Sequence, residues 1–418
     1  MSLVLLVVLL ALTAGSIVYC FLVIAAARRA PRPARDEPTA GRTQPALSIR
    51  KPLRGLDPGL DDNLRSFFRQ DYPEFEILFG IDDPGDPALG VVERVRAEFP
   101  RVPSRVLITG GSPYANPKDF SLETMAKEAA HEILVMSDSD IRVTPDMLRT
   151  LAAEMDDPAM GCLTCPYRAA PGAGFWSVLE ALGMNTEFMA GVLVARMLEG
   201  MKFGVGPTMV IRKEALEKIG WFSRVGDSYI DDFLIGRYTA EAGYRTELSG
   251  YVVEHRIGTM PFWKNLKHRV MWQRGTRFSR PAGYFGQIFT YPIPIALLLL
   301  AAAPAWWPVA AAAGVMRAAA AWTVAVELLG DPLLRRWWVL LPVQDFLSFV
   351  SWAAAFFGDT IVWRGRRFRL GAEGRLIPAG SKGRPEGLCQ PDAEDVVQPE
   401  QTDTGAAAGI DHRQQRDL

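Results

Sequence analysis

The sequence has only four cysteines and no excess of either charge. Cys20 and Cys389 lie in the end segments, while Cys162 and Cys165 form a lone CxxC with no second pair to complete a zinc site. We therefore expect reduced cysteines rather than a disulfide framework or a structural zinc. The formal net charge of −1 gives no global basis for binding nucleic acid.

Long apolar runs are abundant instead, and they are concentrated near the two ends of the chain. The run Ser2–Ala27 carries no charge and is long enough to cross a bilayer core of about 30 Å. Arginines follow it at once, which predicts that this side of the membrane is cytoplasmic. Because the positive residues follow the apolar run, we expect an uncleaved anchor rather than a signal peptide. Residues 1–27 are the predicted anchor, and residues 28–45 are a basic linker.

A second apolar region occupies residues 284–363. A break at Pro304–Pro308 predicts two spans joined by a tight turn with interfacial tryptophans. A third stretch, Trp337–Trp363, either crosses or lies re-entrant against the others. Its polar residues must face protein or a cavity rather than lipid, because lipid offers them no partners. These residues are Gln344, Asp345, Ser348 and Ser351.

The arginines after Trp363 favour the cytoplasmic face, the side on which we also expect the central domain. Four crossings would agree with this only if both ends of the chain were cytoplasmic, and the first anchor argues against that. Either the last segment does not fully cross, or one predicted span is wrong. Residues 371–418 lose the apolar pattern and become rich in Gly, Pro, Gln and Asp, so we expect a disordered tail. The protein is predicted to be integral to the inner membrane.

Residues 46–280 alternate strand-like and helix-like segments, which predicts an α/β domain with a mostly parallel sheet and flanking helices. The expected strands are Ala46–Ile49, Phe75–Ile81, Ser104–Ile108 and Ile133–Met136. The expected helices are Asp61–Gln70, Ala88–Phe99 and Ser121–Ala130.

Acidic residues close two of these strands. Asp138 and Asp140 follow the run that begins at Ile133, and a cluster over Asp82–Asp86 follows Phe75–Ile81. Ligands of open α/β sheets bind at the carboxyl ends of strands. Two carboxylates so close repel each other unless a cation lies between them, and a hard divalent ion suits oxygen ligands. Either motif alone is weak, because acidic pairs also close strands as solvated turns; together they favour a metal–diphosphate site beside a base or ribose site.

A third acidic site, Asp231 and Asp232, precedes a segment with helical spacing. Both carboxylates are favourable at a helix N-terminus for electrostatic reasons alone. The functional interpretation is a carboxylate that takes a proton from an acceptor hydroxyl. His255 follows a strand, where it is either a further ligand or a structural residue.

The segment His268–Phe278 is basic and lies just before the second apolar region. One interpretation is attraction to anionic lipid headgroups. The other is that Trp272 walls the acceptor site while an arginine neutralises the leaving diphosphate. Both can hold at once.

In order along the chain, these pieces resemble the ceramide glucosyltransferase family of membrane-bound GT-A-fold enzymes, glycosyltransferase family 21, and especially its bacterial hopanoid-biosynthesis branch. The resemblance covers residues 1–370. The matching pieces are Lys51–Pro58, Asp71–Pro73, Asp86–Ala88, Asn116–Lys118, Asp138–Val143, Asp231–Asp232 and Trp363–Arg369.

The resemblance implies inverting transfer of glucose or N-acetylglucosamine from a UDP-sugar to a lipid hydroxyl on the cytoplasmic leaflet. It implies that Asp138 and Asp140 hold Mg²⁺ or Mn²⁺, and that Asp232, beside Asp231, is the base. Donor contacts are predicted at Asp83, Asp86, Lys118, Asp138, Trp272, Arg274 and Arg277. The implied partners are the UDP-sugar, a ceramide or hopanoid polyol and the bilayer, with no nucleic acid.

This sequence departs from the family in two places. The closing motif (Gln or Arg, two residues, Arg, Trp) falls on His268–Trp272, with His268 first and Met271 in place of the second arginine. Arg274 or Arg277, one turn on, is the predicted replacement for the lost charge. Asp119 and its successors also depart, in the helix after Lys118. The alternatives are a processive polysaccharide synthase, for which three C-terminal segments are few, and a degenerate UDP-sugar-binding or lipid-binding protein.

Overall fold

A seven-stranded sheet in the order β3-β2-β1-β4-β8-β6-β9 forms the centre of the α/β domain. The computed structural model describes residues 3–32, 44–363 and 365–379. The strands are β1 (Leu47–Leu53), β2 (Phe75–Ile81), β3 (Ser104–Ile108), β4 (Ile133–Ser137), β6 (Met160–Thr164), β8 (Thr208–Arg212) and β9 (Arg245–Leu248). Only β8 runs antiparallel to its neighbours in this sheet. The predicted mostly parallel sheet is confirmed.

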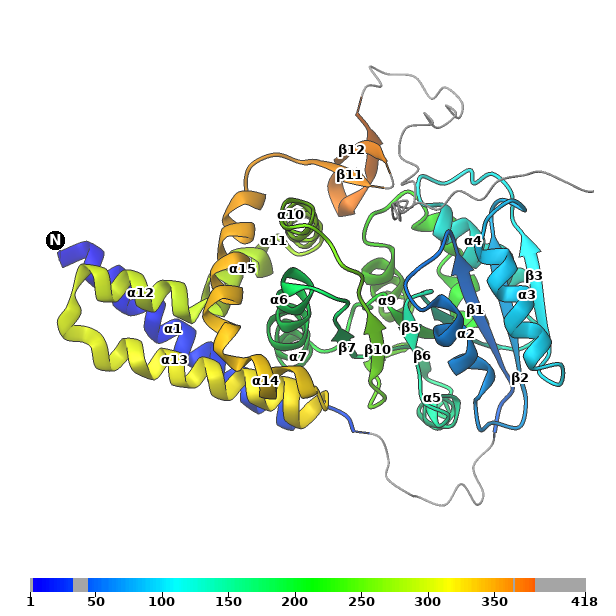
Figure 1. Cartoon of the computed structure of the whole chain (residues 1–418), viewed down its shortest axis with the longest axis horizontal. Coiled ribbons are helices and arrows are strands. Elements are labelled where there is room, and N and C mark those ends of the chain that lie inside the picture. Colours follow the sequence, from blue (N-terminus) through cyan, green and yellow to red (C-terminus); the bar gives the residue numbers. More distant parts are fainter. Residues whose placement is uncertain (1–2, 33–43, 364, 380–418) are drawn as a thin grey trace, which may run out of the picture.

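Helices cover both faces of this sheet (Figure 1). They are α2 (Leu60–Phe68), α3 (Ala88–Glu98), α4 (Pro117–Glu128), α5 (Met147–Glu154), α8 (Lys213–Lys218) and α9 (Asp231–Glu241). Consecutive strand residues face opposite sides, so Phe79 of β2 enters one apolar core and Leu78 enters the other. Helix α4 begins four residues before the predicted Ser121, because Asn116 caps it by accepting from the Lys118 amide at 3.2 Å.

A smaller sheet in the order β5-β10-β7 lies beside the first. Its strands are β5 (Ile141–Arg142), β7 (Tyr167–Ala170) and β10 (Val253–Arg256). β10 pairs with β5 so that His255 lies opposite Ile141, one residue after Asp140. This pairing brings His255 next to the turn that carries Asp138 and Asp140, which we call the acidic turn. The two segments are more than 100 residues apart in the sequence.

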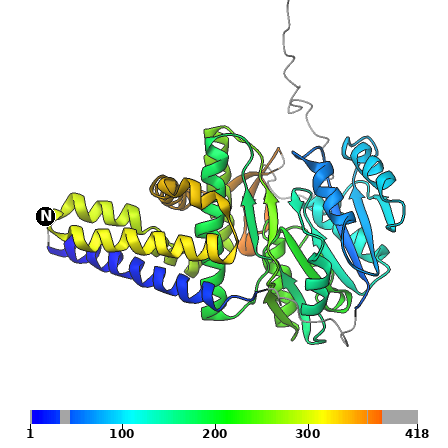
Figure 2. The same cartoon turned by 60° about the horizontal axis from the view of Figure 1, so that its bottom comes forward.

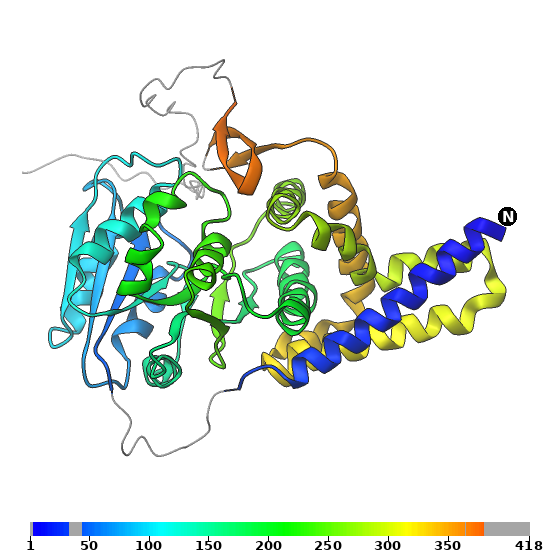
Figure 3. The same ribbon diagram turned by 180° about the vertical axis from the view of Figure 1, so that it is seen from behind.

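Three helices form a bundle that projects from the α/β domain: α1 (Leu3–Arg28), α12 (Pro292–Ala302) and α13 (Trp307–Trp322) (Figures 1 and 3). A 3₁₀ turn at Pro304–Trp306 joins the last two, so the predicted break is confirmed. A bent pair leads into the bundle, with an angle of 58° between the segment Pro281–Thr290 and α12. Helix α11 (Pro281–Gly286) and the 3₁₀ segment Gln287–Thr290 make up the first half of that pair.

Another long apolar helix runs across the base of the bundle. It consists of α6 (Phe175–Gly183), the π-helical segment η1 (Met184–Phe188) and α7 (Met189–Glu199). In Figure 2 this green helix stands crosswise between the bundle and the α/β domain. Its most apolar window is 78% buried, against 22% for α1. Protein rather than lipid therefore covers most of it, although its composition alone would allow a span. This helix was not predicted from the sequence.

Helix α15 (Leu341–Ala355) also runs across the bundle (Figure 1). Its polar side faces the interior of the protein and its apolar side faces outward. Its polar residues Gln344, Asp345, Ser348 and Ser351 are all buried, whereas Val343, Phe346 and Val350 are exposed. The prediction that these polar side chains face protein is confirmed. An apolar outer face on a helix that lies across the bundle is typical of a helix at the membrane interface.

Both ends of α15 lie beside the α/β domain and its flanking helices. Before it, α14 (Pro332–Trp337) packs Leu334 against Leu179 and Leu182 of α6. After it, the carbonyls of residues 356–360 bind arginines of α10 (Phe262–Ser279). Of the two alternatives left by the sequence, this arrangement favours a last segment that does not fully cross, although Pro332–Ala355 is long and apolar enough for a span.

The end of the described chain forms a third sheet, which corrects two predictions. Residues 360–363 are not part of an apolar span but form β11 (Thr360–Trp363), which pairs with β12 (Arg366–Leu370) and, through it, with β13 (Leu376–Pro378). The predicted disordered tail is wrong for residues 371–379, because β13 and the turn before it are paired with other segments. The rest of that tail, residues 380–418, lies outside the described residues.

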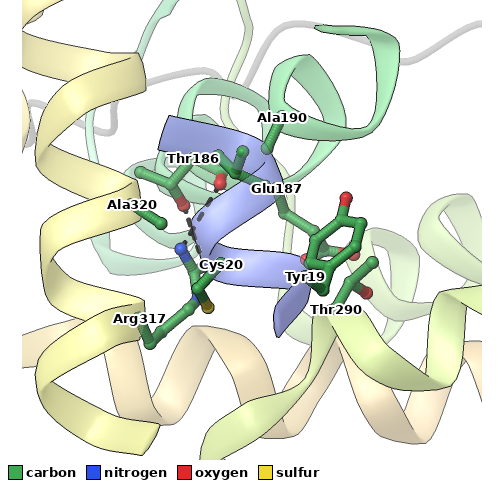
Figure 4. Close-up of a pocket in the computed structure, with 9 residues that line it drawn as sticks. Tyr19, Cys20, Thr186, Glu187, Ala190, Thr290, Arg317 and Ala320 are labelled. Carbon is green, nitrogen blue, oxygen red and sulfur yellow. Dashed lines mark hydrogen bonds between the residues drawn. The ribbon is translucent and has the colours of Figure 1, made fainter. Parts of the chain in front are cut away.

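An ion pair joins α13 to α15 in the interior. Arg317 and Asp345 are 4% and 1% exposed, and their side chains are joined by three N–O contacts of 2.7–3.0 Å. Arg317 also donates to the carbonyl and hydroxyl oxygens of Thr186 in η1, at 3.3 and 3.2 Å (Figure 4). In the same π-helical segment, Asn185 binds the backbone of Ala169 in β7. The segment therefore ties the bundle to the α/β domain.

We expect Arg317→Met to lower the free energy of unfolding by about 3–5 kcal/mol, because it leaves the Asp345 carboxylate buried without its partner. The double variant Arg317→Met/Asp345→Leu should recover most of that loss. Thermal unfolding of the detergent-solubilised chain measures both, with Arg336→Met on the exposed side of α14 as the control. A double variant as unstable as the single one would show that the pair is not the source of the effect.

Candidate active site

The carboxyl ends of β1, β2 and β4 meet at one edge of the large sheet. After β2, the Asp86 carboxylate accepts from the amide of Gly55, which follows β1, at 2.9 and 3.0 Å. It also accepts from the amide of Ala88 at 2.8 Å. Asp83 binds the Gly85 amide at 2.8 Å and so shapes the turn between them. Both predicted base-site or ribose-site acids lie at this edge, where they order its loops.

Asp138 follows β4 and forms an ion pair with Lys118 of α4, with 2.5 Å between Oδ1 and Nζ. Its amide donates to the carbonyl of Pro207 at 3.0 Å, which fixes the backbone of the turn. Burial raises the pKa of Asp138, and the neighbouring Lys118 opposes this. The predicted donor-site residues Lys118 and Asp138 are therefore brought into direct contact.

Asp140 lies beside His255 of β10, with 3.0 Å between Oδ2 and Nε2. Burial would raise the pKa of Asp140, but the imidazole, together with Lys51 and Lys118, outweighs it and lowers that pKa. The other carboxylate oxygen, Oδ1, is buried with no hydrogen-bond partner. From the sequence, His255 was either a ligand or a structural residue, and the structure places its imidazole against the Asp140 carboxylate.

The acidic turn offers the carboxylate oxygens of Asp138 and Asp140, and oxygen atoms are the ligands that a hard divalent ion prefers. Within the described ranges, no group of three His, Cys, Asp or Glu residues is arranged as a ready-made metal site. Such an ion would therefore rely on Asp138, Asp140 and oxygens from a bound diphosphate, as Mg²⁺ sites commonly do. The unpartnered Oδ1 of Asp140 provides one oxygen for this.

Lys51, near the end of β1, is a site residue that sequence analysis missed. It is fully buried, and its ammonium donates to the Asp138 carbonyl. It also lies 3.9 Å from the centroid of the Phe67 ring. Burial lowers the pKa of Lys51 to about 7, and Asp138 and Asp140 oppose the shift. The signal in the sequence was a charged pair, Arg50 and Lys51, near the carboxyl end of a strand.

Asp231 and Asp232 form the first turn of α9, as predicted. The Asp232 Oδ1 atom accepts from the Phe233 amide at 2.8 Å. Gly206 leaves room for the other oxygen, because a Cβ there would lie 2.8 Å from Oδ2.

The pKa of Asp232 is raised to about 7, first by burial and then by Asp231. The positive charge of Lys118 opposes this shift. Burial, and then the negative charge of Asp232, raise the pKa of Tyr167 in β7 and of Tyr229 in the loop before α9. The arrangement gives a carboxylate that exchanges a proton near neutral pH.

Asp119 is a second site residue that was not predicted as one, although it lies in one of the two places where this sequence departs from the family. It is fully buried in the first turn of α4 and accepts from the Asn116 side chain at 3.0 Å. Burial and the facing Asp231 raise its pKa well above the usual range. Lys118, Asp119, Asp231 and Asp232 thus form one electrostatic cluster that reaches Asp138.

Helix α10 carries the predicted closing motif. His268 binds Glu180 of α6, with 3.1 Å between Nδ1 and Oε1, and its ring lies 4.6 Å from that of Trp272. Met271 instead packs in an apolar cluster with the third sheet, β11-β12-β13, which we call the C-terminal sheet. The side chain at position 271 therefore lies in an apolar environment. This environment suits the methionine that stands where the family motif has an arginine.

Arg274 and Arg277 bind the end of α15. Arg274 donates to the carbonyls of Phe357, at 2.7 Å, and Thr360. Arg277 donates to the carbonyls of Phe356 and Gly358, each at 2.7 Å. Cations are favourable at a helix C-terminus, where carbonyls lack partners. These contacts give both arginines a structural role that the sequence did not predict, and the predicted role in neutralising the leaving group stays a prediction.

Known proteins resemble this chain in sequence and fold. It is 27% and 28% identical to ceramide glucosyltransferases 3 and 1 of Caenorhabditis elegans over about half of its length, and spans about half the length of these relatives (45% and 44%). It is 26% identical to an N-acetylglucosaminyltransferase of Rhizobium meliloti, covering 57% of this chain and 58% of that one.

The fold is shared with a solved mannosyltransferase of Pyrobaculum calidifontis, described as a complex with GDP-Man and Mn²⁺. The TM-score is 0.51 at 19% identity, over 84% of this chain and 99% of that one. A family model covers far more of the sequence than the individual curated relatives, from the first helix through the start of β13. Since this match to glycosyl transferase family 21 extends over residues 7–376 and includes every acidic turn described above, the chain belongs to that family.

Proposed function

We propose that this glycosyltransferase moves a sugar from a UDP-sugar to the hydroxyl of a membrane lipid, with inversion at the anomeric carbon. The observation that carries the proposal is the position of Lys118. It contacts Asp138 directly, and its charge also reaches Asp232, where it opposes the rise in pKa. A site suited to a diphosphate and a carboxylate suited to act as a base therefore lie in one cluster. Such a pair is what displacement of a nucleotide diphosphate by a hydroxyl requires.

The names of the relatives support the choice of substrates. Ceramide glucosyltransferases and an N-acetylglucosaminyltransferase are among them, so we propose UDP-glucose or UDP-N-acetylglucosamine as the donor. The acceptor is proposed to be a ceramide or a hopanoid polyol. The bundle and the interfacial face of α15 fit an enzyme that meets its acceptor at the inner membrane, with the α/β domain on the cytoplasmic side.

Each site residue has a role in this proposal. Asp83 and Asp86 order the loops that receive the base and ribose, while Lys118 and Asp138 meet the diphosphate. Trp272 lines the acceptor side. A divalent ion on Asp138 and Asp140, Mg²⁺ or Mn²⁺, would stabilise charge on the departing UDP.

Proton transfer is proposed for the acid pair on α9. Asp232 takes the proton from the lipid hydroxyl as the hydroxyl oxygen attacks the anomeric carbon and the bond to UDP breaks. Asp231 keeps the pKa of Asp232 high enough for this near neutral pH, because two adjacent carboxylates disfavour double ionisation.

We expect Asp232→Asn to lower kcat by about 10²–10⁴-fold, because the amide cannot accept the proton. Binding of UDP-sugar, measured by calorimetry, should stay unchanged. In the wild type, kcat/KM should fall as the pH decreases through about 7, since Asp232 must be deprotonated to act. Glu241→Gln, at the other end of α9, is the control. Near-normal transfer by Asp232→Asn would show that the base is another residue.

Replacement of the Asp140 carboxylate by an amide, which removes its charge and one of its two oxygens, tests the ion. Asp140→Asn should weaken Mn²⁺ binding in the presence of UDP by at least about tenfold, as measured by electron paramagnetic resonance of free Mn²⁺. Asp146→Asn, an exposed aspartate six residues on, should bind Mn²⁺ as the wild type does. Equal affinity in all three proteins would contradict a metal site at Asp140.

Arg277→Gln distinguishes the structural role from the leaving-group role. If the guanidinium acts by capping α15, the variant should lose about 1–3 kcal/mol of unfolding free energy, because hydrogen bonds from a charged group are lost. Affinity for UDP should not change. Unchanged thermal stability together with a reduced kcat would instead support the leaving-group role, and Arg369→Gln on β12 serves as the control.

A further inference from the structure

The loop that precedes the proposed base is held by the end of the described chain. We define the C-terminal strap as residues 372–376, which comprise the turn after β12 and the first residue of β13. The Tyr229 amide donates to the carbonyl of Gly374 at 2.9 Å, and the Leu376 amide donates to the carbonyl of Asp227 at 2.8 Å. The Ser228 hydroxyl donates to the Glu373 carbonyl at 2.9 Å. We propose that this strap is part of the catalytic machinery and positions Asp232.

The opposite side of the same loop contacts the segment that carries Lys118. The Ala115 amide donates to the Asp227 carboxylate at 2.9 Å, and the Asn116 amide donates to the carbonyl of Gly226 at 2.8 Å. The loop is thus bound between the strap and the N-cap of α4. Through these two layers, the strap fixes the position of α9 relative to the Lys118–Asp138 pair.

Glu373 adds a second connection, from the strap to α9 itself. Its carboxylate binds Arg237 at 2.9 Å and accepts from the Tyr238 hydroxyl at 3.3 Å. Both partners lie within two turns of Asp232. Glu373 has a φ of +54°, a left-handed conformation that is uncommon for a residue with a side chain. A strained residue that makes several contacts at once is typical of a functional segment.

The strap rests on an apolar base. Ile361, Phe368, Leu370 and Leu376 are buried in one cluster, and Met271, Phe278 and Tyr229 pack against it. The Trp363 ring meets the Tyr229 ring edge-on at 5.9 Å. The C-terminal sheet lies next to α10 in Figures 1 and 3. The methionine that replaces the family's arginine therefore forms part of the surface on which the strap sits, which explains why an apolar residue suits position 271.

The inference rests on the proposed function, because it assigns Asp232 as the base. Within that function it makes the strap residues positioning residues: they touch the loop and helix around Asp232 rather than the substrate. The contact is tight at Gly374, where a Cβ would lie 2.8 Å from Cγ1 of Ile230, the residue before Asp231.

Gly374→Ala and Gly365→Ala form a matched pair. Both glycines have positive φ, +69° and +75°, so alanine carries a similar backbone cost at each. At Gly365 an added Cβ would meet nothing within 4 Å, whereas at Gly374 it would displace Ile230. Gly374→Ala should lower kcat by about 10- to 100-fold through misplacement of Asp232. It should leave KM for the UDP-sugar unchanged, and Gly365→Ala should match the wild type.

A second pair uses the two acidic partners of Arg237. Glu373 and Glu241 are equally exposed, at 52%, and each binds this arginine, but only Glu373 belongs to the strap. Glu373→Gln should lower kcat by about two- to fivefold, in keeping with a half-exposed ion pair, and Glu241→Gln should not. This pair keeps the inference testable if Gly374→Ala does not fold.

The readouts are UDP release by the full-length solubilised chain and hydrogen exchange of residues 226–232. The assay supplies UDP-glucose or UDP-N-acetylglucosamine with ceramide or a hopanoid polyol, whichever pair the wild type converts. Faster exchange and lower kcat in the strap variants alone would support the inference. Equal kcat in Gly374→Ala and Gly365→Ala, or in the two glutamine variants, would overturn it. No UDP release by the wild type with any pair would instead overturn the proposed function, and this inference with it.

Discussion

The ion pair between Lys118 and Asp138 is the contact on which the rest of the site depends. Asp138 is delivered by a central strand and Lys118 by the first turn of a helix on the face of the sheet. A buried carboxylate is costly unless a cation accompanies it, so the fold must bring α4 to the end of β4. Once Lys118 is there, its charge also reaches Asp231 and Asp232. One lysine thus acts on both halves of the proposed reaction.

The same rule governs the helices around the bundle. Arg317 and Asp345 pair in the interior because lipid would leave each without a partner. Their pairing turns the polar side of α15 inward and its apolar side outward. The helix then presents its apolar face outward, as helices at a membrane interface do, and the chain returns to the α/β domain. That return is what makes a third sheet available beside α10 and α9.

Sequence patterns predicted the features whose signal is local. Phe75–Ile81 and Ser104–Ile108 are strands with the predicted bounds, because apolar runs flanked by turn residues mark strands directly. The acidic turns after β2 and β4 were found for the same reason. The helix Phe175–Glu199 was missed because polar residues such as Asn185 interrupt it, and their partners, Ala169 and Asp331, lie elsewhere in the chain.

Site residues were missed where tertiary contacts decide their role. Lys51 was invisible as a site residue because its partner is a backbone carbonyl, which leaves no trace in the sequence. Arg274 and Arg277 illustrate the same problem, since carbonyls of the segment after α15 occupy their guanidinium groups. Charge and spacing identified these arginines as important without identifying what they bind.

The C-terminal strap shows why composition alone fails at the end of the chain. Residues 372–376 are mostly small or polar, a composition typical of disorder. They are ordered because the loop before Asp231 supplies hydrogen-bond partners and Met271 supplies an apolar contact. The strap is therefore held by its contacts with the loop before α9 and with α10. The order of the strap therefore reports on the geometry of the site, and this coupling is what allows so distant a segment to position a carboxylate.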